Sequence, residues 1–300
     1  MKGLKPGEYG FLLLTSSLGN PGRKPLTIAQ MRELFTRYDH MKGRDISRDV
    51  DIRDFVSIGY SPKFAGHVID LLRDEPLLQY YLSKAGKAGC IPITRATEDY
   101  PLLVRKRLDL DSPGVLWAKG DLSVLETPAV ALVGSRELNE ENARFAAEAG
   151  RQAALQGYTL VSGNARGADK IAQKACLEHG GRVISVVADS LEKKKAMKNV
   201  LWLSEDSFDM EFSSQRALSR NRVIHALGLK TFVAQASLKT GGTWDGTVKN
   251  LRCGWSPVFG FNDGSEAMTH LGQLGANLIG WEHLQSIYDL QSASDNFFDR

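Results

Sequence analysis

The stretch AVALVGSR, residues 129–136, joins a short, continuous apolar run to a small polar turn. An apolar run without polar alternation is typical of a strand that is buried on both faces. The same rhythm returns in YTLVSG (158–163), RVISVVA (182–188), TFVAQA (231–236), PVFGF (257–261) and ANLIG (276–280), with helical segments between most of them. Strands that alternate with helices in this way predict an α/β fold with a mostly parallel, doubly wound sheet.

The first 88 residues have a different texture. Apolar residues at helical spacing predict a helix in LTIAQMRELFTRY (26–38) and a second one in AGHVIDLLRD (65–74). Nothing in this region indicates chemistry. We therefore expect a small helical N-terminal module over 1–88, a sheet domain over 89–290 and a tail over 291–300.

Composition excludes few classes of protein. The formal net charge of +3 neither indicates nor excludes a nucleic-acid partner. Cys90, Cys176 and Cys253 are far apart and show no metal-ligand spacing, which argues against a disulfide framework and against a zinc site. The longest early apolar run, residues 11–14, is too short for a signal peptide or a membrane span. We therefore expect a cytoplasmic protein that has no membrane contact, metal or cofactor.

Three glycine-rich loops follow predicted strands: GSR (134–136), SGNARGAD (162–169) and SLKTGGT (237–243). The carboxyl ends of parallel strands meet at one edge of a sheet, where ligands bind near helix N-termini. Glycine lets the backbone approach a ligand, and hydroxyl and N–H groups bind phosphate oxygens. Arg136, Arg166 and Lys239 add positive charge at the same edge. Together the loops predict an anion site, although each loop alone is also compatible with a simple tight turn.

The stretch SQRALSRNRVIHALG (214–228) collects arginines ahead of an apolar helical segment that ends at Gly228. If the helix begins near Ser219, Arg220 and Arg222 lie in its first turn, where the helix dipole disfavours cations. The arrangement then costs stability unless an anion binds there or nearby acids pair with the arginines. Acids that could do so are Asp206, Asp209 and Glu211.

No pattern indicates catalysis. The chain has neither a GxGxxG fingerprint nor a Walker A sequence, and no convincing Ser/His/acid set. We expect His179 and His225 to be surface or packing residues. Asp169, the one acid in the glycine-rich loops, is expected to cap a helix or to pair with Arg166 rather than to act as a base. The protein is therefore not expected to be an enzyme.

The blocks VALVGSR (130–136), LVSGNARGAD (160–169), SRNRVIHALG (219–228) and GANLI (275–279) resemble the signature blocks of the DNA-processing protein A family, also called DprA or Smf. EDYP (98–101) and SPGVLWAKGDL (112–122) are similar to the segment that leads into the Rossmann domain of that family. The blocks run in order from about residue 88 to about residue 280. Residues 1–88 resemble the family's helical module only loosely.

This resemblance implies an extended Rossmann domain that binds single-stranded DNA without sequence preference. It further implies that the protein protects such strands, helps to load a RecA-type recombinase in natural transformation or recombination, and forms a homodimer. Phe212 and Trp244 are candidates for base stacking, because unspecific strand binders combine a basic groove with aromatic side chains. The candidate DNA-binding or phosphate-binding residues are Gly134, Ser135, Arg136, Ser162, Gly163, Arg166, Gly167, Arg220, Asn221, Arg222, Lys239, Gly241, Gly242 and Thr243.

The chain also departs from the family pattern. Ala168 and Ala172-Gln173 replace an apolar residue and an Ala-His pair, and DSLEKKKAMKN (189–199) replaces a loop that usually carries Tyr-Pro. The lysines of that loop either extend a phosphate track or form a solvated loop. Because the stretch after GANLI is short, we expect that the chain lacks the winged-helix module of many relatives. These departures weaken the transfer of transformation-specific roles from the family to this chain more than they weaken the transfer of strand binding.

Two other functions remain open. SGNARGAD also resembles a wider superfamily of ligand-binding Rossmann domains, related to cytokinin-activating phosphoribohydrolases, so the chain could sense a nucleotide-derived small molecule, for example in phage defence. A nucleoside-monophosphate phosphoribohydrolase would need a PGGxGTxxE loop. TGGTWDGT (240–247) has the glycines of that loop but lacks its Pro and Glu, which disfavours this enzyme.

Overall fold

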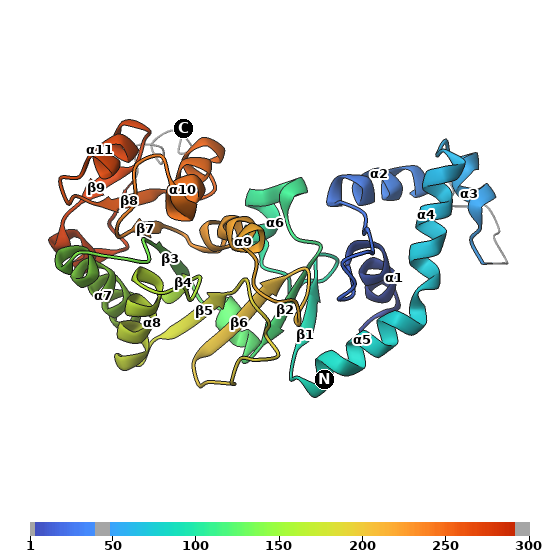
Figure 1. Ribbon diagram of the computed structural model, residues 1–300, viewed down its shortest axis with the longest axis horizontal. Coiled ribbons are helices and arrows are strands. Elements are labelled where there is room, and N and C mark those ends of the chain that lie inside the picture. Colours follow the sequence, from blue (N-terminus) through green and yellow to red (C-terminus); the bar gives the residue numbers. More distant parts are fainter. Residues whose placement is uncertain (1–3, 40–48, 292–300) are drawn as a thin grey trace.

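The computed structural model describes residues 4–39 and 49–291 (Figure 1). The tail expected over 291–300 therefore lies, except for its first residue, outside the described residues. The helices α1 (Pro6–Thr15), α2 (Ile28–Asp39), α3 (Ile52–Ser57), α4 (Pro62–Arg73) and α5 (Glu75–Lys87) precede the sheet. The helix predicted over 26–38 is α2, and the one predicted over 65–74 is α4, which begins earlier because Ser61 caps it by accepting from the Phe64 N–H.

The described residues form one nine-stranded sheet in the order β1-β2-β6-β5-β4-β3-β7-β8-β9. Its strands are β1 (Ile91–Thr94), β2 (Val115–Lys119), β3 (Ala129–Val133), β4 (Thr159–Ser162), β5 (Arg182–Val186), β6 (Val200–Glu205), β7 (Thr231–Val233), β8 (Val258–Phe261) and β9 (Asn277–Ile279). Strand β2 runs antiparallel to both of its neighbours, and the other pairs are parallel. The predicted mostly parallel α/β fold is therefore confirmed.

Helices cover both faces of this sheet (Figure 1). On one face lie α7 (Glu140–Leu155) and α8 (Ala168–Glu178), together with α1 and α5. On the other face lie α6 (Leu102–Leu108), α9 (Ser214–Leu227), α10 (Gly241–Cys253) and α11 (Glu266–Gln273). Strand β3 shows why its sequence is apolar throughout, since Val130 and Leu132 pack on the first face while Ala131 and Val133 pack on the second.

The strand order reverses at β3. From β3 the chain proceeds to β4, β5 and β6 on one side, and it later returns to place β7, β8 and β9 on the other side. The loops that leave the carboxyl ends of β3 and β7 therefore diverge toward opposite faces. In open α/β sheets such a switch point leaves a crevice in which ligands bind.

Candidate functional site

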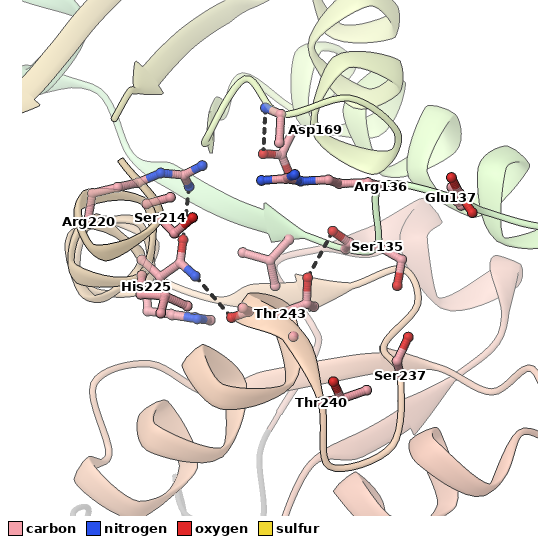
Figure 2. A pocket seen from close by; sticks show the side chains of 18 residues that line it. Ser135, Arg136, Glu137, Asp169, Ser214, Arg220, His225, Ser237, Thr240 and Thr243 are labelled. Carbon is pink, nitrogen blue, oxygen red and sulfur yellow. Dashed lines mark hydrogen bonds between the residues drawn. The ribbon is translucent and has the colours of Figure 1, made fainter. Parts of the chain in front are cut away.

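A cleft of about 480 Å³ lies at this switch point (Figure 2). Its walls are the loop after β3, the helix α9, and the loop that leads from β7 into α10. Of the residues predicted from the sequence, the cleft brings together Gly134, Ser135, Arg136, Arg220, Asn221, Gly241, Gly242 and Thr243.

Hydrogen bonds to backbone carbonyl oxygens hold the loops of the cleft together. The Ser135 N–H donates to the carbonyl oxygen of Gln235 over 3.0 Å, and the Thr243 hydroxyl donates to the carbonyl oxygen of Gly134 over 2.9 Å. Gly167 adopts φ +85°, and a Cβ there would lie 2.4 Å from the Ser135 carbonyl oxygen. Only glycine therefore lets the loop after β4 approach the loop after β3 so closely.

The N-terminus of α10 opens into the cleft. No side chain caps this helix, although Thr240 occupies the capping position, and Gly241 and Gly242 form its first turn. The first N–H groups of a helix have no partner within the helix, and they carry a partial positive charge. This wall of the cleft is therefore suited to an anion.

Arg220 lies on the opposite wall, on α9 (Figure 2). It is 8% exposed and donates to the carbonyl oxygen of Gly163 over 3.1 Å and to Oδ1 of Asn221 over 3.0 Å. Burial lowers the pKa of Arg220, but an arginine side chain keeps its proton inside proteins. A Cβ on Gly163 would lie 1.8 Å from Nη1 of Arg220, so the guanidinium fits only because position 163 is glycine.

Asp169 also lines the cleft, and it is buried. Its Oδ2 accepts the N–H groups of Gly163 and Ala165, each over 3.1 Å. Burial raises the pKa of Asp169, against the opposing effects of the Arg220 charge and of the two N–H groups. Asp169 therefore organises the loop after β4. It does not cap α8, which has no side-chain cap, and it does not pair with Arg166, so neither expected role is observed. Arg166 instead pairs with Glu137 over 2.7 Å at the surface.

Arg136 is exposed at the mouth of the cleft, opposite Arg220 (Figure 2). It forms no ion pair with any residue in 4–39 or 49–291. Two guanidinium groups therefore face the cleft from different elements, and the unpaired N–H groups of α10 complete the third side. This arrangement can bind an anion through charge-assisted hydrogen bonds.

A second cavity of about 450 Å³ continues the cleft past the loop after β4. The two cavities share Arg136 and Arg220 as lining residues. Phe212, which is 54% exposed, lies at the second cavity, as do Gly163 and Arg166. The two cavities therefore adjoin at these two arginines, and together they are called the groove below.

Several predicted residues do not reach the cleft. Ser162 is fully buried, and its hydroxyl accepts from Nε2 of Gln173 over 2.6 Å. Lys239 is exposed but lines neither cavity. Trp244, predicted to stack on bases, is only 7% exposed and packs in the core, so it presents no ring face to a ligand.

The helix start expected near Ser219 is wrong. Helix α9 begins at Ser214, where Ser213 caps it by accepting from the Arg216 N–H, so Arg220 lies beyond the first turn. Arg222 points away from the cleft and pairs with buried Glu205 over 2.8 Å. The acid that neutralises an arginine is therefore not one of the three expected from the sequence.

Arg216, in the first turn of α9, also serves the structure. Its Nη1 donates to the carbonyl oxygens of Ala188 and Met210, both over 2.9 Å. Of the lysines in the loop 189–199, Lys193 pairs with Glu211 and Lys194 with Asp189, each over 2.6 Å. A continuous phosphate track along that loop is therefore not observed.

Some residues that line the cleft were not predicted from the sequence. Ser214, Leu218 and His225 of α9 contribute to it, beside Asn221. Their spacing of four, three and four residues places them on one face of the helix, and this was the signal that could have found them. Glu137, Ser237 and Thr240 also line the cleft.

Within residues 4–39 and 49–291, no group of His, Cys, Asp and Glu side chains is arranged to hold a metal ion. No helix of the same residues has the length and the apolar character that crossing a membrane requires.

Known proteins match part of this chain in sequence. DNA processing protein DprA of Streptococcus pneumoniae is 32% identical over 56% of this chain and 64% of its own length. Protein Smf of Escherichia coli is 29% identical over 63% of this chain and 56% of its own length. The chain thus matches less than two thirds of the length of these relatives.

Solved structures agree on the fold. The structure of DprA from Streptococcus pneumoniae aligns with a TM-score of 0.68 at 23% identity, over 96% of this chain and 100% of that one. A structure of DNA processing protein A from Helicobacter pylori, which concerns its single-stranded DNA binding mode, aligns with a TM-score of 0.55 at 25% identity, over 66% of this chain and 93% of that one. The family model for DNA recombination-mediator protein A matches residues 92–249, and the chain belongs to this family.

Proposed function

We propose that this chain binds single-stranded DNA without sequence preference and acts as a recombination mediator. The observation that carries the proposal is the pair Arg136 and Arg220, which line both cavities of one groove. Two cations that share a groove can hold successive phosphates of a strand, whereas a single closed anion site could hold only one. The strand-binding mode described for the Helicobacter pylori relative supports the same assignment.

The groove also offers a place for bases. Phe212 is exposed beside the second cavity, and base stacking on such a ring is tolerant of sequence. In this proposal phosphates lie at Arg136, Arg220 and the N-terminus of α10, and a base packs on Phe212.

The proposed partners of this chain are those implied by its family. The bound strand is protected and then transferred to a RecA-type recombinase, and the working form is a homodimer. The chain has no catalytic role in this scheme.

Fluorescence anisotropy of a labelled poly-dT oligonucleotide, titrated at several salt concentrations, tests the proposal. We expect the logarithm of the association constant to fall linearly with the logarithm of the salt concentration, with a slope of about −0.7 per phosphate contacted. Arg136→Ala and Arg220→Ala should each weaken binding about tenfold, because each removes a charge-assisted hydrogen bond. Each should also make the salt slope shallower by about 0.7 if one phosphate contact is lost.

The matched control is Arg252→Ala. Arg252 is exposed near the other end of α10, so this variant removes the same charge far from the groove. It should bind poly-dT like the unmodified chain. Equal weakening by all three substitutions would mean that net charge, and not the groove, determines binding.

A nucleotide-derived small molecule is the second candidate ligand. A volume of about 480 Å³ for the first cavity lies within the range of small-ligand pockets. This alternative predicts that a nucleotide raises the melting temperature while poly-dT shows no anisotropy change at low salt. That outcome would replace strand binding with ligand sensing.

A further inference from the structure

His225 on α9 lines the cleft, and only one of its two ring nitrogens is engaged in hydrogen bonds with the described residues. The ring is 1% exposed, yet it lines the cleft (Figure 2). Its Nδ1 lies 3.3 Å from Nδ2 of Asn250 and 3.3 Å from the Thr231 hydroxyl. Among the described residues, none forms a hydrogen bond with Nε2.

The neighbouring amide decides where the proton of His225 resides. Oδ1 of Asn250 accepts the Ser256 N–H over 2.9 Å, and Nδ2 donates to the Ser256 carbonyl oxygen over 3.2 Å. The opposite orientation of this amide would face donor with donor and acceptor with acceptor. Nδ2 of Asn250 is therefore the atom that meets His225, so Nδ1 accepts and the proton lies on Nε2.

This N–H group is a neutral donor. Burial, together with the positive charge of Arg220, lowers the pKa of His225 to about 3. The ring is thus uncharged near neutral pH, and it offers a ligand a hydrogen bond without a charge. Its role differs from that of the two arginines, which attract phosphate.

The space around Nε2 is small and partly apolar. A Cβ on Gly246 of α10 would lie 3.3 Å from Nε2, so the missing side chain at that position leaves room beside this nitrogen. Leu218 lies on the same face of α9 as His225. It is 51% exposed and also lines the cleft. An apolar side chain next to a neutral donor suits a flat, weakly polar group better than a phosphate.

We propose that one nucleobase of the bound strand enters the cleft, packs against Leu218 and accepts a hydrogen bond from Nε2–H of His225. The inference rests on the proposed strand binding and identifies how the cleft holds a base. All four bases carry acceptors on their edges, so the contact adds affinity without requiring a sequence. Phosphates on either side of this base then lie near Arg136 and Arg220.

The test compares two oligonucleotides that have the same shape and the same charge. One is poly-dT, and in the other 2,4-difluorotoluene replaces thymine, which keeps the ring shape but removes the carbonyl acceptors. We expect the unmodified chain to bind poly-dT about 2- to 10-fold more tightly, as for one neutral hydrogen bond. Anisotropy at one low salt concentration measures this ratio.

Two variants assign the ratio to His225. His225→Asn keeps an acceptor at the position of Nδ1 but lacks the Nε2–H, so the ratio should fall to about one. His225→Gln keeps an N–H at the position of Nε2, so the ratio should survive. Survival of the ratio in His225→Asn with an unchanged melting temperature would overturn the assignment.

The comparison also separates this inference from the proposed function. Equal binding of both oligonucleotides by the unmodified chain would overturn base insertion and leave strand binding intact. Absence of binding to either one would instead overturn strand binding itself. The comparison on the unmodified chain decides the inference even if a His225 variant does not fold.

Discussion

At the scale of single residues, the groove depends on a contact that only glycine permits. The Arg220 guanidinium occupies the space in which a Cβ of residue 163 would stand. Gly163→Ala must therefore push the guanidinium away from its place between the two cavities. We expect this substitution to weaken poly-dT binding about as much as Arg220→Ala does, about tenfold, measured by the same anisotropy titration.

Gly10→Ala is the control for this prediction. Gly10 lies in α1, has open space around the position of a Cβ, and does not adopt positive φ. Alanine there should raise the free energy of unfolding by up to about 1 kcal/mol through helix propensity and leave DNA binding unchanged. A Gly163→Ala protein that melts normally and binds DNA fully would show that Arg220 does not need its present position.

At the scale of one element, α9 is held in place by an ion pair on the side that faces away from the cleft. Arg222 and Glu205 form this pair, and the Glu205 side chain is 3% exposed. Removing one partner of a buried pair leaves an uncompensated charge, which costs about 3 kcal/mol or more. We expect Arg222→Ala to lower the free energy of unfolding by that amount, measured by urea denaturation, while DNA affinity changes by less than about twofold.

The cost of Arg222→Ala should depend on pH. Burial raises the pKa of Glu205 above its ordinary value, so folding disfavours the ionised form of this side chain. A group with a raised pKa loses its stabilising contribution as the pH rises, and Arg222→Ala removes the Arg222 charge, the largest influence that opposes the effect of burial. The loss in Arg222→Ala should therefore be larger at about pH 8 than at about pH 5. The double variant Glu205→Gln, Arg222→Ala should recover part of the stability and lose the pH dependence.

Element by element, the sequence predicted the loops of the site better than its helix. The loops after β3 and β7 follow apolar strands, and strand ends of a parallel sheet must share an edge, so their meeting could be predicted. Arg220 and Arg222 look equivalent in sequence, but residues two apart on a helix point in different directions. Which of them faces the cleft depends on the packing of α9 against β3, β4 and β5, and Glu205, the buried acid at the end of β6, could not be recognised as a partner from the sequence. Trp244 was misplaced for the same reason, because burial depends on α10 packing on the sheet.

At the scale of the whole molecule, the first helices and the sheet share one core. Tyr81 of α5 packs against Trp117 of β2 and Phe208 after β6, with ring centroids 5.2 and 4.7 Å away. Its hydroxyl lies 2.7 Å from Asp209 Oδ1. We expect Tyr81→Ala to lower the free energy of unfolding by about 3 to 5 kcal/mol through the cavity it leaves, measured by urea denaturation.

The neighbouring Tyr80 provides the comparison. It lies on the same helix and is 67% exposed, so Tyr80→Ala should change the free energy of unfolding by less than about 0.5 kcal/mol. Equal effects of the two substitutions would mean that α5 does not rest on the sheet. A large effect of Tyr81→Ala alone would mean that the first 88 residues cannot be removed without exposing an apolar surface.

The sequence indicated the helical character of the first residues but not this attachment. Leu78 and Tyr81 have the spacing of any amphipathic helix, and such a stripe does not show which surface it covers. Strands β1, β2 and β6 were also missed. They break the alternation of strand and helix, because β5 reaches β6 through a loop and β2 runs antiparallel to its neighbours. Periodicity identifies a repeated unit well and an irregular extension poorly.

The outermost strands of the sheet have a consequence for the solution behaviour of the protein. Strand β1, at one end, contains Pro92, which has no N–H to donate, and β9, at the other end, spans only Asn277–Ile279. Long, flat, outer strands recruit further chains into aggregates, and proline and short length are two ways in which proteins prevent this. The two margins of this sheet are therefore poor templates for the addition of further chains, which favours a dispersed protein in solution.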